Sequence, residues 1–103
     1  MIYVHFECKN GNDYYGLTIE GHAGYSDNGN DIVCAGASAI AYTLLGYLNN
    51  LEIDTLNYRD CSGDFYVNCV TDDERVETAF EMAEIGFLQL ENTYPQCVRV
   101  RKN

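Results

Sequence analysis

The sequence predicts an α+β fold, a two-layer ββαββαβ domain in which two helices pack on a mostly antiparallel sheet. Three observations predict it. Short segments of alternating apolar and polar residues occur at the start, middle and end of the chain; two longer segments between them have helical patterning; and the length of 103 residues is that of one domain. Apolar residues make up 47% of the chain, enough for one core without a metal or disulfides. We therefore expect residues 1–103 to form a single domain.

The first two strands are predicted from residues 2–6 and 15–19, where apolar and polar side chains alternate as in a half-buried strand. Residues 9–13 read Lys-Asn-Gly-Asn-Asp, a composition typical of turns, so the two strands form an antiparallel hairpin. Residues 21–30 follow, with three glycines and little periodicity. They predict one long loop.

Residues 32–51 carry no charge and are predicted to form a helix, with Asp31 or Asn30 as its N-cap. The segment is about long enough to cross a bilayer. Its flanks, Asp31 and Glu52, are acidic and lack the Lys or Arg anchors of a membrane span. We therefore interpret it as a soluble helix buried between the sheet and a second helix.

Residues 55–60 and 65–70 flank the turn sequence Cys-Ser-Gly-Asp and predict a second hairpin. Thr71 and Glu74 then fit a capping box, in which Thr71 is the N-cap of a second helix.

Apolar residues at helical spacing give this second helix one apolar stripe over about four turns. They are Val76, Phe80, Ala83, Phe87 and Leu90. Pro95 ends the helix, and Val98 and Val100 alternate with arginines in a short last strand.

Charge excludes several partners. Six Lys and Arg against sixteen Asp and Glu leave a net charge of −10, which repels nucleic acid and anionic membrane surfaces and favours basic peptides. Phosphate-binding and dinucleotide-binding glycine motifs do not occur, so we expect no cofactor. Exposed strand edges and nine tyrosines favour a homodimer.

The chain has five cysteines, an odd number, and none of them form a CxxC pair. Its first residues lack the pattern of a secretory signal. We expect free thiols in a reducing cytoplasm. The chain's two histidines and its cysteines show no recognised ligand spacing, so no metal site is predicted.

Cys34 is the cysteine best placed for nucleophilic catalysis. If Asp31 caps the helix, Cys34 is near its third residue, where free amides favour a thiolate and provide donors for an oxyanion. His22 lies at the end of the second predicted strand, and a turn of the glycine-rich loop brings it to Cys34 as a base. The loop itself, residues 23–30, is a candidate for ordering over the site when a peptide binds.

Structural roles for the same residues remain open. Free cysteines are often buried, so Cys34 at a helix start also fits simple packing, and His22 also fits a histidine bonded to the backbone. His5 lies on a predicted strand with a structural role as its default. Packing is likewise expected of the four remaining cysteines, Cys8, Cys61, Cys69 and Cys97.

Three short segments are familiar. Gly-His-Ala at 21–23, Asp-Ile-Val-Cys-Ala at 31–35 and Ser-Ala at 38–39 resemble the signature of the bacterial ribosomal-processing cysteine protease family. The element order, the length and the Tyr-Pro before the last strand are similar too, so the resemblance covers nearly the whole chain. Gly36 and Ala37 depart from the family, which commonly has a small residue and a valine there.

The resemblance implies a catalytic dyad of His22 and Cys34, with Asp31 as a third member or only a helix cap. It implies a cytoplasmic cysteine endopeptidase that removes the N-terminal extension of a large-subunit ribosomal protein, cutting after Phe. Supporting positions are Asp31, Ala35 and Ser38, and the substrate loop contains Gly21, Ala23, Gly24 and Gly29.

Two other functions compete with the protease. One is a non-catalytic acidic module that binds a ribosomal protein or assembly factor, with Cys34 as a packing residue. The other is a redox-active thiol protein, although no second cysteine lies near Cys34 in the sequence to form a disulfide with it.

Overall fold

The computed structural model describes residues 1–9, 13–27 and 31–103. The element order is ββαββαβ, as the sequence predicts. The elements are β1 (Ile2–Lys9), β2 (Tyr14–Gly21), α1 (Ile32–Asn50), β3 (Asn57–Cys61), β4 (Asp64–Val70), α2 (Glu74–Thr93) and β5 (Val98–Lys102). Residues 10–12 of the first predicted turn and residues 28–30 of the predicted long loop lie outside the described residues.

The five strands form one sheet in the order β3-β4-β2-β1-β5. Three of its four strand pairs are antiparallel, and β5 lies parallel to β1. The predicted α+β fold with a mostly antiparallel sheet is thereby confirmed. The directions also make β3 parallel to β2, so α1 is the crossover between these two strands, as parallel strands require.

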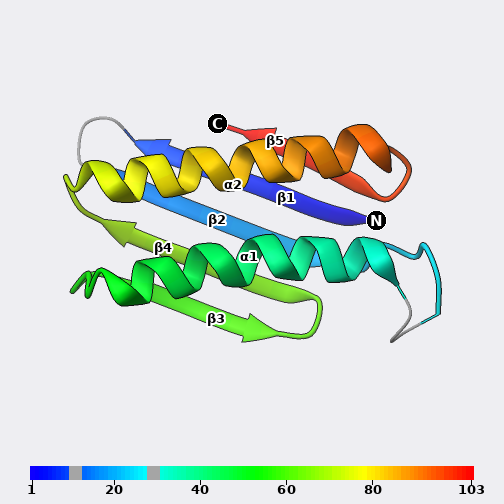
Figure 1. Cartoon of the computed structure of the whole chain (residues 1–103), viewed down its shortest axis with the longest axis horizontal. Helices are drawn as coiled ribbons and strands as arrows, with labels where there is room; N and C mark the ends of the chain where they lie inside the picture. Colours follow the sequence, from blue (N-terminus) through cyan, green and yellow to red (C-terminus); the bar gives the residue numbers. More distant parts are fainter. Residues whose placement is uncertain (10–12, 28–30) are drawn as a thin grey trace.

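Both helices cover the same face of the sheet, with α1 over β2, β4 and β3 and α2 over β1 and β5 (Figure 1). The core lies between the two layers. Alternate residues of the strands enter it, among them Phe6, Leu17 and Val67, which occupy one row across β1, β2 and β4. Phe87 of α2 is fully buried, and its ring meets Phe6 edge-on at 6.0 Å between centroids.

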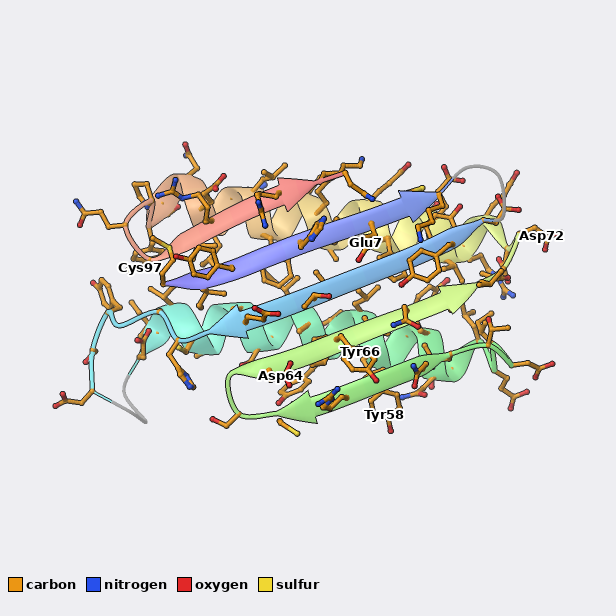
Figure 2. The ribbon with its side chains drawn as sticks, turned by 180° about the vertical axis from the view of Figure 1, so that it is seen from behind. Glu7, Tyr58, Asp64, Tyr66, Asp72 and Cys97 are labelled. Carbon is orange, nitrogen blue, oxygen red and sulfur yellow. The ribbon has the colours of Figure 1, made fainter. Side chains whose placement is uncertain are left out.

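The opposite face of the sheet is open (Figure 2). It carries polar and aromatic side chains, including Glu7 and Tyr66. At the β5 edge, the Glu91 carboxylate of α2 accepts a hydrogen bond of 2.8 Å from the Val100 amide. The opposite edge, β3, is exposed along its whole length. The two edges of the sheet thus differ: a side chain occupies one backbone amide of β5, whereas β3 is exposed.

Helix α1 is long and apolar enough to span a membrane by length and composition, with a mean hydropathy of 1.4. In the fold it lies on the sheet and beside α2, as expected for a helix of a globular domain. The sequence predicts a helix enclosed between the sheet and a second helix. In the structure it is only partly enclosed, because six of its 19 residues are buried. Its outer face is exposed but uncharged, with residues such as Tyr42, Thr43 and Tyr47.

The start of α2 corrects the predicted capping box. The N-cap is Asp73, whose carboxylate accepts from the Arg75 amide at 2.9 Å. Thr71 instead accepts from the Asp73 amide and forms a turn before the helix. Because Asp ranks above Thr as an N-cap, the helix starts two residues later than the box predicts.

Replacing Phe87 with alanine removes a ring that is 0% exposed and leaves a cavity between the layers. We expect a loss of about 3–5 kcal/mol in the free energy of unfolding. Urea denaturation measures it. Ile85→Ala is the matched control, because Ile85 lies on the same helix and is 56% exposed; we expect it to change stability by less than about 0.5 kcal/mol. Equal losses in the two variants would contradict this account of the core.

Candidate active site

The site lies at one end of the sheet, where three segments meet. Strand β2 ends at Gly21 and leads into His22, and α1 starts from this same end because it crosses back over the sheet. Strand β3 runs parallel to β2, so the β3–β4 turn is also at this end. The turn is bonded to the end of β2, because the Gly21 N–H donates to the Gly63 carbonyl at 2.9 Å.

Asp31 is the N-cap of α1, one of the two caps that the sequence allows. One carboxylate oxygen accepts from the amides of Val33 and Cys34 at 2.9 and 3.0 Å. The other accepts from the amides of Tyr25 and Ser26 at 3.0 and 3.3 Å. Asp31 therefore binds the start of the helix to the loop that leaves β2.

These bonds act on the Asp31 carboxyl. The amide of Cys34 makes the largest contribution, and together with those of Ser26, Tyr25 and Val33 it holds the pKa of the carboxyl below its ordinary value of 3.8. Partial desolvation opposes this effect and does not overcome it. Every hydrogen bond of this carboxylate in the described chain goes to a backbone amide, so here Asp31 caps the helix and does not contact His22.

Cys34 is the third residue of α1, as the sequence predicts, and it is half-buried. The backbone N–H of Ala23 donates to its sulfur at 3.3 Å. The prediction that the Cys34 amide is free to hold an oxyanion is wrong, because that amide and its neighbour at Val33 donate to Asp31. The N–H that donates to the sulfur is that of Ala23, in the loop that follows β2.

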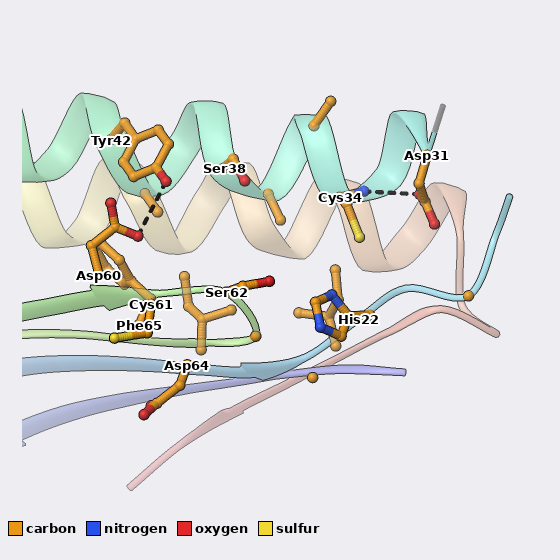
Figure 3. A pocket seen from close by; sticks show the side chains of 18 of the residues that line it. His22, Asp31, Cys34, Ser38, Tyr42, Asp60, Cys61, Ser62, Asp64 and Phe65 are labelled. Carbon is orange, nitrogen blue, oxygen red and sulfur yellow. Dashed lines mark hydrogen bonds between the residues drawn. The ribbon is translucent and has the colours of Figure 1, made fainter. Parts of the chain in front are cut away.

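His22 is exposed and lies below Cys34, between α1 and the β3–β4 turn (Figure 3). Its carbonyl accepts from the amino group of Met1 at 2.5 Å. Its Nε2 lies over Gly63, and the other ring nitrogen is directed toward α1. Among the described residues, no hydrogen bond joins the His22 ring to the Cys34 sulfur. The two residues are thus brought to the same end of the sheet without a hydrogen bond between their side chains.

A cavity of about 890 Å³ opens beside the two residues. The predicted positions Ala35 and Ser38 lie on its α1 wall with Cys34. Its floor is apolar where Phe65 and Ala37 are buried. Tyr42 of α1 and the opposite wall, which comes from the second hairpin, were not predicted from the sequence; the hairpin residues are Asp60, Cys61, Ser62, Gly63, Asp64 and Phe65.

The predicted substrate loop is described in part. Gly21 and Gly24 line the cavity, and Ala23 is buried with its amide on the Cys34 sulfur. Gly29 lies outside the described residues. Of the two departures from the family, Ala37 lines the cavity, whereas Gly36 faces α2, where a Cβ would come within 3.3 Å of Leu90.

The four other cysteines differ in their surroundings. Cys69 is buried, and burial raises the pKa of its thiol to about 11; Cys8 and Cys97 pack at the edge of the core. Packing is wrong for Cys61, which is exposed at the end of β3. Its side chain points away from α1, as its pairing opposite Asp64 requires, and so it does not face Cys34 (Figure 3).

Metal ligands are not gathered in the part of the chain that the structure describes: no group of three His, Cys, Asp or Glu side chains there is arranged to hold an ion. His5 lies in β1, on the sheet surface that faces away from the core.

The comparison with protein families decides the class of the site. The family model described as "Cysteine protease Prp" matches residues 1–99. The chain belongs to the cysteine protease Prp family. It is therefore a cysteine protease, and the recognition of this family from its short segments is confirmed.

Relatives of the Prp family support the assignment. The ribosomal processing cysteine protease Prp of Staphylococcus aureus (strain Mu50 / ATCC 700699) is 29% identical over 87 residues, 82% of each chain. A crystal structure of Prp from S. aureus with a covalently linked product peptide superposes with a TM-score of 0.83, at 25% identity over 100% of both chains. The protein SMU.848 of Streptococcus mutans superposes with a TM-score of 0.74, at 29% identity over 99% of this chain and 93% of that one.

Asp31→Asn tests the double role of the cap. An amide side chain has one acceptor oxygen where the carboxylate has two, so it cannot hold both pairs of amides. We expect faster hydrogen exchange at Tyr25 and Ser26 or at Val33 and Cys34, measured by NMR. Asp27→Asn is the matched control, because no described hydrogen bond involves that carboxyl, and it leaves these four amides unchanged.

The same bonds give a pH dependence of known sign. The folded state lowers the pKa of Asp31, so the stabilisation is complete above the ordinary value of 3.8 and is lost as the pH falls through the lowered pKa. Protection of the four amides should therefore decrease below about pH 4 in the wild type. Asp31→Asn should not show this step. Protection independent of pH in the wild type would contradict the assignment.

Proposed function

We propose that this cysteine protease removes the N-terminal extension of a large-subunit ribosomal protein by cutting after a phenylalanine, with Cys34 as nucleophile and His22 as base. The observation that carries the proposal is Cys34 at the start of α1 on the wall of the cavity, with His22 facing it. The staphylococcal relative is named for ribosomal processing and has been crystallised with a covalently linked product peptide. A covalently bound peptide fits a nucleophilic cysteine.

The reaction follows the chemistry of cysteine acyl transfer. His22 takes the thiol proton, and Cys34 attacks the scissile carbonyl to form a carbon–sulfur bond. The imidazolium then gives its proton to the departing amine as the carbon–nitrogen bond breaks. Water, deprotonated by His22, hydrolyses the resulting thioester and restores the thiol. The side chains of His22 and Cys34 share no hydrogen bond among the described residues, so this proton transfer requires the two groups to come closer when the peptide binds.

The Ala23 amide has two successive uses in this scheme. It donates to the Cys34 sulfur at 3.3 Å, which favours negative charge on that atom before attack. After attack the charge moves to the oxygen on the carbon bonded to sulfur, next to the same donor. Ala23 thus takes the oxyanion role that the amides of Val33 and Cys34 cannot take while Asp31 accepts from them.

The cavity fits both halves of the proposed substrate. Its apolar floor of Phe65, Ala37 and Ile19 accepts an aromatic side chain such as that of phenylalanine. Carboxylates of Asp31 and Asp60 lie on its walls and attract a basic segment after the cut. The net charge of −10 acts in the same direction over a longer range.

The setting we propose is the cytoplasm, where ribosomal proteins are made, and the assembly is a homodimer. Free cysteines fit a reducing compartment. Exposed apolar side chains on the helix layer, including Met82 and Ile85, support association of two copies.

The proposal predicts one cut in a peptide that spans a ribosomal-protein extension and the mature start. Mass spectrometry should find a cut after phenylalanine with the wild type and none with Cys34→Ala. Cys8→Ala is the control, because Cys8 lies at the far end of β1 from Gly21 and should leave cleavage unchanged. No cut by folded wild type would overturn the substrate assignment and favour a module that binds the ribosomal protein without cleaving it.

A further inference from the structure

The turn between β3 and β4 is in contact with the proposed base. The His22 ring lies directly on Gly63: a Cβ built at Gly63 would be 2.7 Å from Nε2, 3.3 Å from Cε1 and 3.4 Å from Cδ2. Carbon and nitrogen atoms do not approach this closely, so any side chain there must displace either the ring or the turn. The Gly63 carbonyl also accepts from Gly21, the residue before His22.

The same hairpin is attached to the helix that carries Cys34. The Tyr42 hydroxyl of α1 donates to the Asp60 carboxylate at 3.1 Å, and the Tyr42 ring meets Phe65 edge-on at 6.3 Å. The bond to Asp60 is the main reason that the pKa of Tyr42 is raised above its ordinary value of 10.0. One hairpin therefore contacts α1 at one point and His22 at another (Figure 3).

The orientation of the ring follows from this contact. With Nε2 over Gly63, the nitrogen directed toward α1 is Nδ1, and Cys34 lies on that side (Figure 3). A ring that is displaced from the turn loses this orientation. Misplacement of a catalytic group by about 1 Å costs on the order of 100-fold in rate.

We propose that Gly63 is a positioning residue, whose missing side chain allows the β3–β4 turn to hold the His22 ring with one nitrogen toward Cys34. The inference rests on the proposed roles of His22 and Cys34. Gly63 does not touch the substrate in this scheme; it acts through the histidine. Its φ of +73° is a second reason for glycine, and the experiment must separate the two.

Two variants separate backbone strain from the steric effect. Gly63→Ala adds a Cβ and strains the backbone, whereas Gly63→Asn adds a Cβ but tolerates the left-handed region better. We expect both to lower kcat on the peptide by about 100-fold, with KM changed by less than about threefold. Gly46→Ala is the control, because Gly46 lies on α1 with nothing within 4 Å of an added Cβ, and it should keep full activity.

A double-mutant cycle tests whether Gly63 acts through His22. Each Gly63 variant is also made in the His22→Ala background, and the pH profile of Cys34 alkylation by iodoacetamide is measured, because this needs no turnover. We expect the Gly63 variants to move the profile toward that of His22→Ala, and to cause no further change once His22 is absent. Thermal unfolding checks that each variant is folded.

Three results would overturn the inference or its basis. Full activity of Gly63→Asn would show that the added Cβ does not disturb the base. An equal change of the alkylation profile with and without His22 would show that the turn acts on Cys34 by another route. Full activity of His22→Ala would overturn the proposed dyad itself, and with it the inference, whereas an inactive His22→Ala beside an active Gly63→Asn overturns the inference alone.

Discussion

The geometry of the site depends on the hydrogen bonds that the Asp31 carboxylate accepts from backbone amides. A helix start leaves amides without partners, and a loop that leaves a strand does the same; this one side chain accepts from both. Cys34 is the third residue of α1 only because the helix begins where Asp31 caps it. The loop that positions the Ala23 amide at the sulfur is attached at the same point. Nucleophile and donor therefore share one anchor.

Much of the fold could be predicted, because period-two and helical patterns report which face of an element is buried. Residues such as Val4, Leu17 and Phe87 are core residues in both the prediction and the structure. Boundaries were less predictable. Thr71 with Glu74 has the pattern of a capping box, yet Asp73 between them is the N-cap and accepts from the Arg75 amide, while Thr71 accepts from the Asp73 amide.

The site was predictable on one side only. His22, Asp31 and Cys34 are close in sequence, so a turn and a helix start suffice to bring them together. Asp60 and Gly63 reach the cavity through the pairing of β3 with β4 and of β4 with β2, and local sequence patterns do not reveal the order of strands in a sheet. The ring that lies on Gly63 belongs to a residue 41 positions earlier in the chain. Similarly, Gly36 faces Leu90 of the other helix.

The two edges of the sheet have a consequence for how copies of the chain can associate. An uncovered edge strand offers a row of amides and carbonyls to any other strand, and a sheet open at both edges can add copies without limit. Here Glu91 holds a backbone amide of β5, while β3 stays exposed. Edge-to-edge pairing of β3 with β3 joins two copies about a twofold axis and uses this edge in both, so further growth has to use the β5 edge, where Glu91 already occupies the Val100 amide. The geometry thus permits a closed pair and opposes a growing fibre.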